Sequence, residues 1–114
     1  MDIIINQPQL VNVVKLYLRK SFGNLTPKTD PKSPNSIFYV NSDNKIFMEY
    51  DEKKEYVWID NYLIWSKLES LFYIDYEDIQ LIMKDWLDEH YNLSGITPLA
   101  FNGSAWWIFR GITI

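Results

Sequence analysis

The residue types best suited to metal chemistry gather around the only histidine of the chain, His90. Three carboxylates close to it in the sequence are Asp85, Asp88 and Glu89. Carboxylates together with an imidazole can bind zinc, manganese or iron. On a helix, however, ligands share a face only at spacings of three or four residues, which pairs His90 with Leu87 and Trp86 instead. We therefore expect His90 to pack or to end a helix, and we expect no metal and no cofactor.

This sequence contains no complete set of residues for nucleophilic catalysis. Cysteine is absent, and no serine stands in the Gly-x-Ser-x-Gly pattern of a nucleophile elbow. Ser104 follows a glycine, but nothing in the sequence marks it as activated. The four glycines, at positions 23, 95, 103 and 111, are too scattered to form a phosphate-binding loop. The sequence therefore predicts a protein that is not an enzyme.

Charge is distributed unevenly along the chain, whose formal net charge is −4. Residues 1–45 contain six Lys or Arg and three Asp or Glu, whereas residues 46–114 contain five and twelve. An acidic domain repels nucleic acid and is attracted to basic protein surfaces. The carboxylates that we expect to contact such a surface are Asp51, Glu52 and Glu55 on a predicted hairpin and Asp85, Asp88 and Glu89 on a predicted helix.

These six carboxylates predict a protein-binding module that mimics a polyanion and occupies the basic cleft of a partner, such as a nuclease or a nucleic-acid-binding protein. Immunity proteins that neutralise toxins and inhibitors encoded by phages are the comparable class, although no shared motif supports the comparison. The abundant Ile, Asn and Lys indicate an AT-rich genome, so a phage or mobile element is an expected source. A merely solvated acidic surface is the alternative explanation of the same carboxylates.

Nucleic-acid binding is the weaker alternative, although two predicted helices between residues 60 and 91 resemble a helix-turn-helix in outline. The second of them, over residues 75–91, carries six acidic residues against Lys84 alone. This charge opposes the phosphate contacts that supply most of the affinity for DNA. The remaining candidates for a nucleic-acid contact are Lys15, Arg19, Lys20, Lys28 and Lys32.

The spacing of apolar residues predicts an α+β fold. An N-terminal helix runs from the cap Asn6 to the stop Gly23, after a possible short strand at residues 3–5. A proline-rich surface loop over residues 24–35 leads to a three-stranded antiparallel meander at 36–40, 45–50 and 55–60. An αα-hairpin follows, whose helices are capped by Asp60 or Asn61 and by Asp75. In the second strand, Ile46, Met48 and Tyr50 are expected on one face, opposite Phe47 and Glu49.

The C-terminal segment 104–114 is predicted to be a strand that joins this sheet. Strand spacing places Trp106 and Ile108 on one face and Trp107 and Phe109 on the other. Because an exposed strand this apolar would aggregate, we expect one face to lie in the core. The other face, led by Trp106 or Trp107, is left for a partner protein or for a second copy of the chain. A structural subunit or homo-oligomer that assembles through aromatic surfaces is therefore an alternative function.

The composition fits one compact domain over residues 1–114, since 114 residues and 13.6 kDa match the usual domain size. Aromatic residues make up 17% of the chain, which suits either a small core or an interface. Because the sequence has no cysteine, no signal-peptide pattern and no long apolar run, we expect a cytoplasmic protein with no membrane contact.

Overall fold

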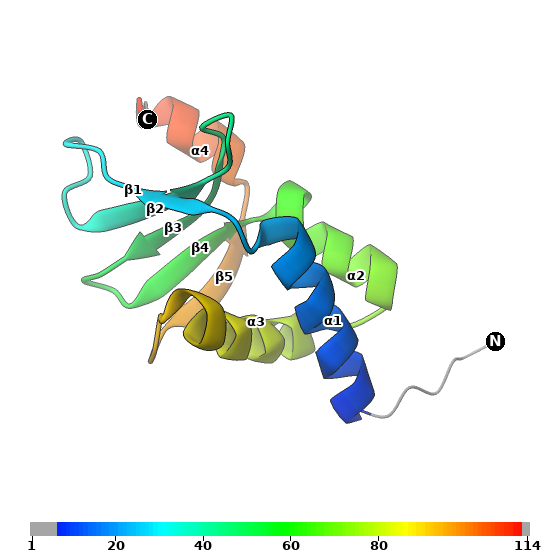
Figure 1. Ribbon diagram of the computed structural model, residues 1–114. Coiled ribbons are helices and arrows are strands. Elements are labelled where there is room, and N and C mark those ends of the chain that lie inside the picture. The colour runs from blue at the N-terminus through cyan, green and yellow to red at the C-terminus, as the bar shows by residue number, and fades with distance from the viewer. Residues whose placement is uncertain (1–6, 113–114) are drawn as a thin grey trace.

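The computed structural model describes residues 7–112, and these form an α+β fold around a five-stranded mixed sheet. The predicted fold class is therefore confirmed. The possible strand at residues 3–5 lies outside the described residues. Figure 1 shows the elements, which are α1 (Gln7–Phe22), β1 (Thr26–Lys28), β2 (Ser36–Val40), β3 (Ile46–Asp51), β4 (Tyr56–Asp60), the π-helical turn η1 (Asn61–Trp65), α2 (Ser66–Phe72), α3 (Tyr76–Tyr91), β5 (Thr97–Phe101) and α4 (Gly103–Phe109).

The sheet has the strand order β1-β2-β3-β4-β5, and its three central strands are the predicted antiparallel meander. Two edge strands were not predicted. β1 interrupts the segment 24–35, which is therefore not a loop throughout, and pairs antiparallel with β2. β5 pairs parallel with β4, from Tyr56 opposite Thr97 to Asp60 opposite Phe101. A parallel pair needs a long crossover, and here η1, α2 and α3 supply it.

Of the predicted caps, Asp60 caps the π-helical turn η1 at the start of the crossover, and Asp75 caps α3. The Asp60 side chain accepts a hydrogen bond from the backbone N–H of Leu63 at 2.9 Å. Asp75 caps α3 in the same way through the N–H of Asp78, also at 2.9 Å. The first turn after Asp60 is π-helical before the chain continues as α2, a detail that the apolar spacing does not indicate. Short side-chain oxygens at these positions satisfy N–H groups that have no partner inside the helix.

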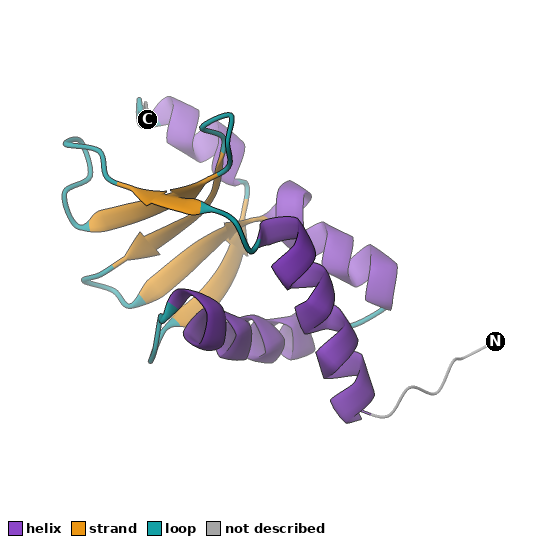
Figure 2. Ribbon diagram, viewed as in Figure 1, coloured by secondary structure: helices purple, strands orange, loops and turns teal. Residues whose placement is uncertain are grey.

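The sheet has helices on both faces, and the hydrophobic core on one face is much larger than the core on the other. Figure 2 shows α1, α2 and α3 gathered on one side of the strands and α4 on the other. The main core lies under α1, α2 and α3 and includes Val57 and Ile59, which alternate along β4 with less buried residues. A smaller cluster of Phe38, Val40 and Trp107 lies under α4. Both faces of the sheet are therefore covered, one by the main core and the other by the smaller cluster.

A register shift between β2 and β3 changes the predicted faces of β3. The shift falls between Tyr39 and Val40 of β2, and it places Ile46 against the small cluster under α4. Phe47, Met48 and Tyr50 all contact the main core. The expectation that Ile46 shares a face with Met48 and Tyr50 is therefore wrong, because an irregular register breaks the two-residue period of the strand.

The predicted strand over residues 104–114 is wrong, since this segment contains α4. β5 already occupies the free edge of β4, at residues that were not predicted as a strand. Gly103 permits the close packing of α4, because a Cβ atom there would lie 2.8 Å from the Trp107 ring. In a helix, adjacent residues point about 100° apart and do not occupy opposite faces. Trp107 faces the sheet and is buried at 3% exposure, whereas Trp106, about 100° around the helix from it, remains 48% exposed.

Candidate functional site

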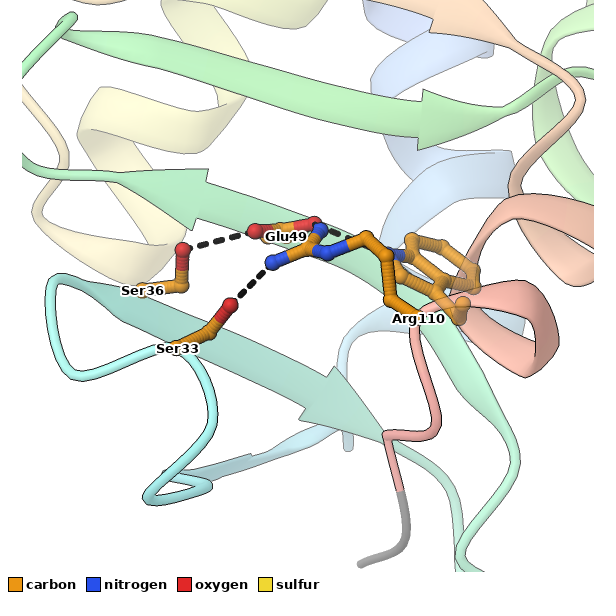
Figure 3. Close-up of polar contacts among 5 residues, drawn as sticks. Ser33, Ser36, Glu49 and Arg110 are labelled. Carbon is orange, nitrogen blue, oxygen red and sulfur yellow. Dashed lines mark hydrogen bonds and ion pairs between the residues drawn. The ribbon is translucent and has the colours of Figure 1, made fainter.

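A buried carboxylate holds α4 against the sheet. Glu49 lies in β3 at 3% exposure, on the face that α4 covers. Its Oε1 atom accepts hydrogen bonds from the indole Nε1 of Trp107 at 2.9 Å and from the Arg110 guanidinium at 2.7 Å. Its Oε2 atom accepts one from the Ser36 hydroxyl at 2.6 Å, and the Arg110 guanidinium also donates to Ser33 (Figure 3). A buried charge needs such partners, so the network explains why a charged residue can occupy a central strand.

The outer side of α4 carries three large apolar side chains with little contact to the rest of the chain. We define the aromatic face of α4 by Trp106, Ile108 and Phe109, which are 48%, 79% and 82% exposed. The Trp106 and Phe109 rings stack with their centroids 6.0 Å apart, and the Arg110 guanidinium lies 5.8 Å from the Trp106 ring. Three large apolar side chains that remain in water on one short helix are characteristic of a contact surface.

An open cleft of about 550 Å³ borders α4 on the same side of the sheet. We call it the α4 cleft. Its walls are the loop before β2, the hairpin between β3 and β4, and one side of α4. Aromatic side chains in its lining are Trp58, Phe101 and Trp106. Charged side chains in its lining are Lys32, Lys53, Lys54, Arg110, Glu49 and Asp51.

The six carboxylates predicted to contact a partner lie in two groups. Asp85 and Glu89 project from α3 with side chains 71% and 62% exposed, and both contact the Lys15 ammonium of α1, at 3.5 Å and 2.9 Å. Partial burial lowers the pKa of Lys15, but the two carboxylates outweigh this effect, and the net pKa is raised. Asp88 accepts a hydrogen bond from the Ser94 hydroxyl at 2.9 Å.

The second group lies on the hairpin between β3 and β4. Asp51 accepts hydrogen bonds at 3.1 Å from the backbone N–H groups of both Lys53 and Lys54, so it shapes the turn. Glu52 and Glu55 are exposed. The Glu55 carbonyl accepts a hydrogen bond from the backbone N–H of Thr97 at 2.9 Å, which fixes the hairpin beside the start of β5. The hairpin and the C-terminal end of α3, whose last turn includes Asp88, lie toward the same end of the molecule (Figure 1).

The single histidine packs against the end of α3. The His90 ring stacks on the Trp86 ring with a centroid distance of 5.3 Å, and its Nε2 atom lies 2.7 Å from the carbonyl oxygen of Gly23. Residues 7–112 contain no group of three or more His, Asp or Glu side chains placed to hold a metal ion. The carboxylates near His90 in the sequence therefore do not gather around its ring.

The five cations considered for nucleic-acid binding are dispersed. Lys15 is paired with carboxylates, and Arg19 and Lys20 lie on the same helix, α1. Lys28 lies on the edge strand β1, where its ammonium donates to the Asn44 side chain at 2.6 Å. Lys32 reaches the opposite side of the sheet and donates to the Gly111 carbonyl at 2.5 Å. Lys15, Arg19 and Lys20 thus share one helix, whereas Lys28 and Lys32 lie elsewhere.

Sequence analysis missed two features of this region, the role of Glu49 and the α4 cleft. A charged residue in the middle of an apolar strand was the available signal for Glu49.

No helix within the described residues is long and apolar enough to cross a membrane. No protein-family model matches the chain, and searches among curated proteins and solved structures returned no significant match either.

Proposed function

We propose that this protein is a non-enzymatic protein-binding module that blocks a basic partner protein by occlusion. The partner contacts the aromatic face of α4, and the carboxylates of α3 and of the hairpin orient its approach. This is the mode of action of immunity proteins and of small phage-encoded inhibitors.

The observation that carries the proposal is the exposure of Trp106, Ile108 and Phe109 on one short helix. Large aromatic side chains provide most of the binding energy at the centres of protein interfaces. The helix that presents them is fixed from below by the buried bond between Trp107 and Glu49, so the face is presented on a rigid support. A preorganised contact surface loses little conformational entropy on binding.

The inference that the partner is basic rests on the negative charge of this chain. The chain has a net charge of −4, and Glu52, Glu55 and Asp88 are exposed at one end of the molecule. Such a charge distribution accelerates association with a basic surface and is screened by salt. Asp85 and Glu89 contribute less, because Lys15 already neutralises part of their charge.

The test uses the full chain as bait in a lysate of the native host. The double variant Ile108→Ser/Phe109→Ser removes the two most exposed side chains of the aromatic face, and Leu81→Ser, which changes a 67% exposed leucine on α3, is the matched control. We expect a basic protein to be retained by the wild-type chain and by the control, and to bind the double variant at least about tenfold more weakly. Equal retention by all three chains would refute the role of α4.

The basic nature of the partner is tested separately by reversing charge. Replacing Glu52, Glu55 and Asp88 by lysine should slow association with the retained partner and reduce the salt dependence of the rate. Glu69→Lys, on α2, is the control for a single exposed carboxylate away from that end. Association rates that do not change on charge reversal would contradict the basic partner while leaving the contact through α4 in place.

Self-association is the second candidate function, because an exposed aromatic face can pair with the same face of another copy in a symmetric dimer. Sedimentation velocity of the wild-type chain and of the Ile108→Ser/Phe109→Ser variant distinguishes the two functions. A wild-type dimer that the double variant converts to a monomer supports self-association, whereas a monomeric wild type excludes it.

A further inference from the structure

We propose that the α4 cleft binds a small planar aromatic anion with the size and chemistry of a nucleoside monophosphate. This ligand site is distinct from the contact surface for the protein partner, because the two share only Trp106 and the cleft is formed largely by elements other than α4. Its volume of about 550 Å³ lies within the range of small-molecule sites, roughly 300–1,000 Å³.

One part of the cleft lining is aromatic and comes from three separate elements. Trp58 of β4 is half-buried, and its ring contacts the Phe101 ring of β5 with a centroid distance of 5.4 Å. Trp106 of α4 completes the set and remains 48% exposed. A planar ring can stack on such side chains, and stacking on aromatic residues contributes substantially to the binding of nucleotide bases.

The charged part of the lining favours an anion. Four cations line the cleft against two carboxylates, and both carboxylates already have partners. Glu49 binds Arg110, Trp107 and Ser36, and Asp51 accepts the backbone N–H groups of the hairpin. No ion pair or hydrogen bond of the Lys53 or Lys54 ammonium occurs within residues 7–112. These two exposed ammonium groups are therefore available to a phosphate.

A single phosphate suits this site better than a long polyanion. Glu52 and Glu55 flank the two lysines on the same hairpin, so a nucleic-acid strand continuing past the cleft would meet carboxylates. The net charge of −4 adds to this repulsion. An uncharged aromatic ligand, in turn, would make no use of Lys53 and Lys54. The combination of a ring with one compact charge matches both halves of the cleft.

The experiment titrates the full chain with three probes, AMP, adenosine and inorganic phosphate, and follows tryptophan fluorescence and amide chemical shifts. We expect AMP to bind with a submillimolar Kd, and adenosine and phosphate each to bind at least about tenfold more weakly. Chemical shifts should change at Trp58, Phe101 and Trp106. Adenosine lacks the charged group and inorganic phosphate lacks the ring, so each of them can contact only one half of the site.

Three variants connect binding to named groups. Lys53→Ala/Lys54→Ala should weaken AMP binding by about tenfold and leave adenosine unchanged, whereas Trp106→Ala should weaken both. Lys67→Ala/Lys84→Ala, which removes two exposed lysines outside the cleft, should leave the Kd for AMP unchanged. Absence of AMP binding at millimolar concentration, or AMP binding insensitive to Lys53→Ala/Lys54→Ala, would overturn the proposal. An oligothymidylate that binds more than about tenfold more tightly than AMP would also overturn it, in favour of a single-stranded nucleic acid.

Discussion

Replacing Trp107 by alanine should release α4 from the sheet, whereas the same replacement at Trp106 should leave it in place. The two residues are adjacent and chemically identical, so they differ only in where the fold puts them. Trp107 is 3% exposed and donates to Glu49, whereas Trp106 is 48% exposed. The pair therefore tests the placement of α4 with the side-chain chemistry held constant.

The size of the effect follows from the buried area. A tryptophan buries roughly 200 Å² of surface, and at roughly 25 cal/mol per Å² this corresponds to about 5 kcal/mol. Alanine retains a small part of that area, and Trp→Ala changes in cores typically cost about 3–5 kcal/mol. Glu49 keeps its bond to Ser36 of β2 after the change, and the release of α4 exposes its other oxygen atom to water, so no buried charge is left without a partner. We expect Trp107→Ala to cost about 4 kcal/mol.

Trp106→Ala should cost much less, because the side chain loses only exposed contacts. Its ring stacks on Phe109 and lies 5.8 Å from the Arg110 guanidinium. Exposed interactions of these kinds contribute about 0.5–1 kcal/mol each. We therefore expect a cost of about 1 kcal/mol for Trp106→Ala.

Urea denaturation and amide hydrogen exchange together measure both effects. Denaturation gives the free energy of unfolding of each variant, and exchange reports whether α4 opens separately from the main core. Trp107→Ala should accelerate exchange in residues 103–109 while the amides of β3 and β4 stay protected. Equal costs for the two variants, or a larger cost for Trp106→Ala, would refute the packing of Trp107 beneath α4.

Two further predictions concern the caps and the alkaline limit of stability. Asp60→Ala should cost about 2 kcal/mol in urea denaturation and Asp75→Ala about 1 kcal/mol, because the first cap is fully buried and the second is exposed. The reverse order would contradict the role of burial. Burial raises the pKa of Tyr91, a hydrogen bond from the Leu25 N–H opposes this, and Tyr39 adds to the rise. Because the raised pKa makes Tyr91 harder to ionise in the folded protein than in the unfolded chain, a pH above the ordinary tyrosine pKa favours unfolding. Thermal stability should therefore fall as the pH rises above about 10. In Tyr91→Phe the fall should be shallower, and a wild-type Tm that does not change between about pH 9 and 11 would contradict the assignment.

The elements that the sequence predicted correctly are those whose residues form a local pattern. The 3.6-residue spacing of α1 and α3, the cap Asp75 and the alternation of Val57 and Ile59 each depend on near neighbours in the chain. The strands β2, β3 and β4 alternate with short polar turns for the same reason. Local patterns also predicted the existence of the crossover helices, although not the π-helical turn at their start.

The candidate site was predicted only in part, because its members meet through the tertiary fold. Glu49 and Arg110 lie 61 residues apart in the sequence and form an ion pair at 2.7 Å. Lys15 and Glu89 lie 74 residues apart and contact at 2.9 Å, which reduces the free charge of the predicted acidic surface. No spacing rule relates residues at such separations, so neither contact could be deduced from the pattern of the chain.

The sequence alone determined the α+β class, the acidic charge and the presence of a strongly apolar C-terminal segment. Only the tertiary structure decided whether that segment folds as a strand or as a helix. A short apolar run is compatible with either a strand or a helix, and the choice depends on whether a sheet edge is open to it. Here β5 occupies the edge beside β4, so the segment folds as α4 on the opposite side of the sheet. That choice buries Trp107 against Glu49 and leaves Trp106 partly exposed, as a member of the aromatic face that also lines the α4 cleft.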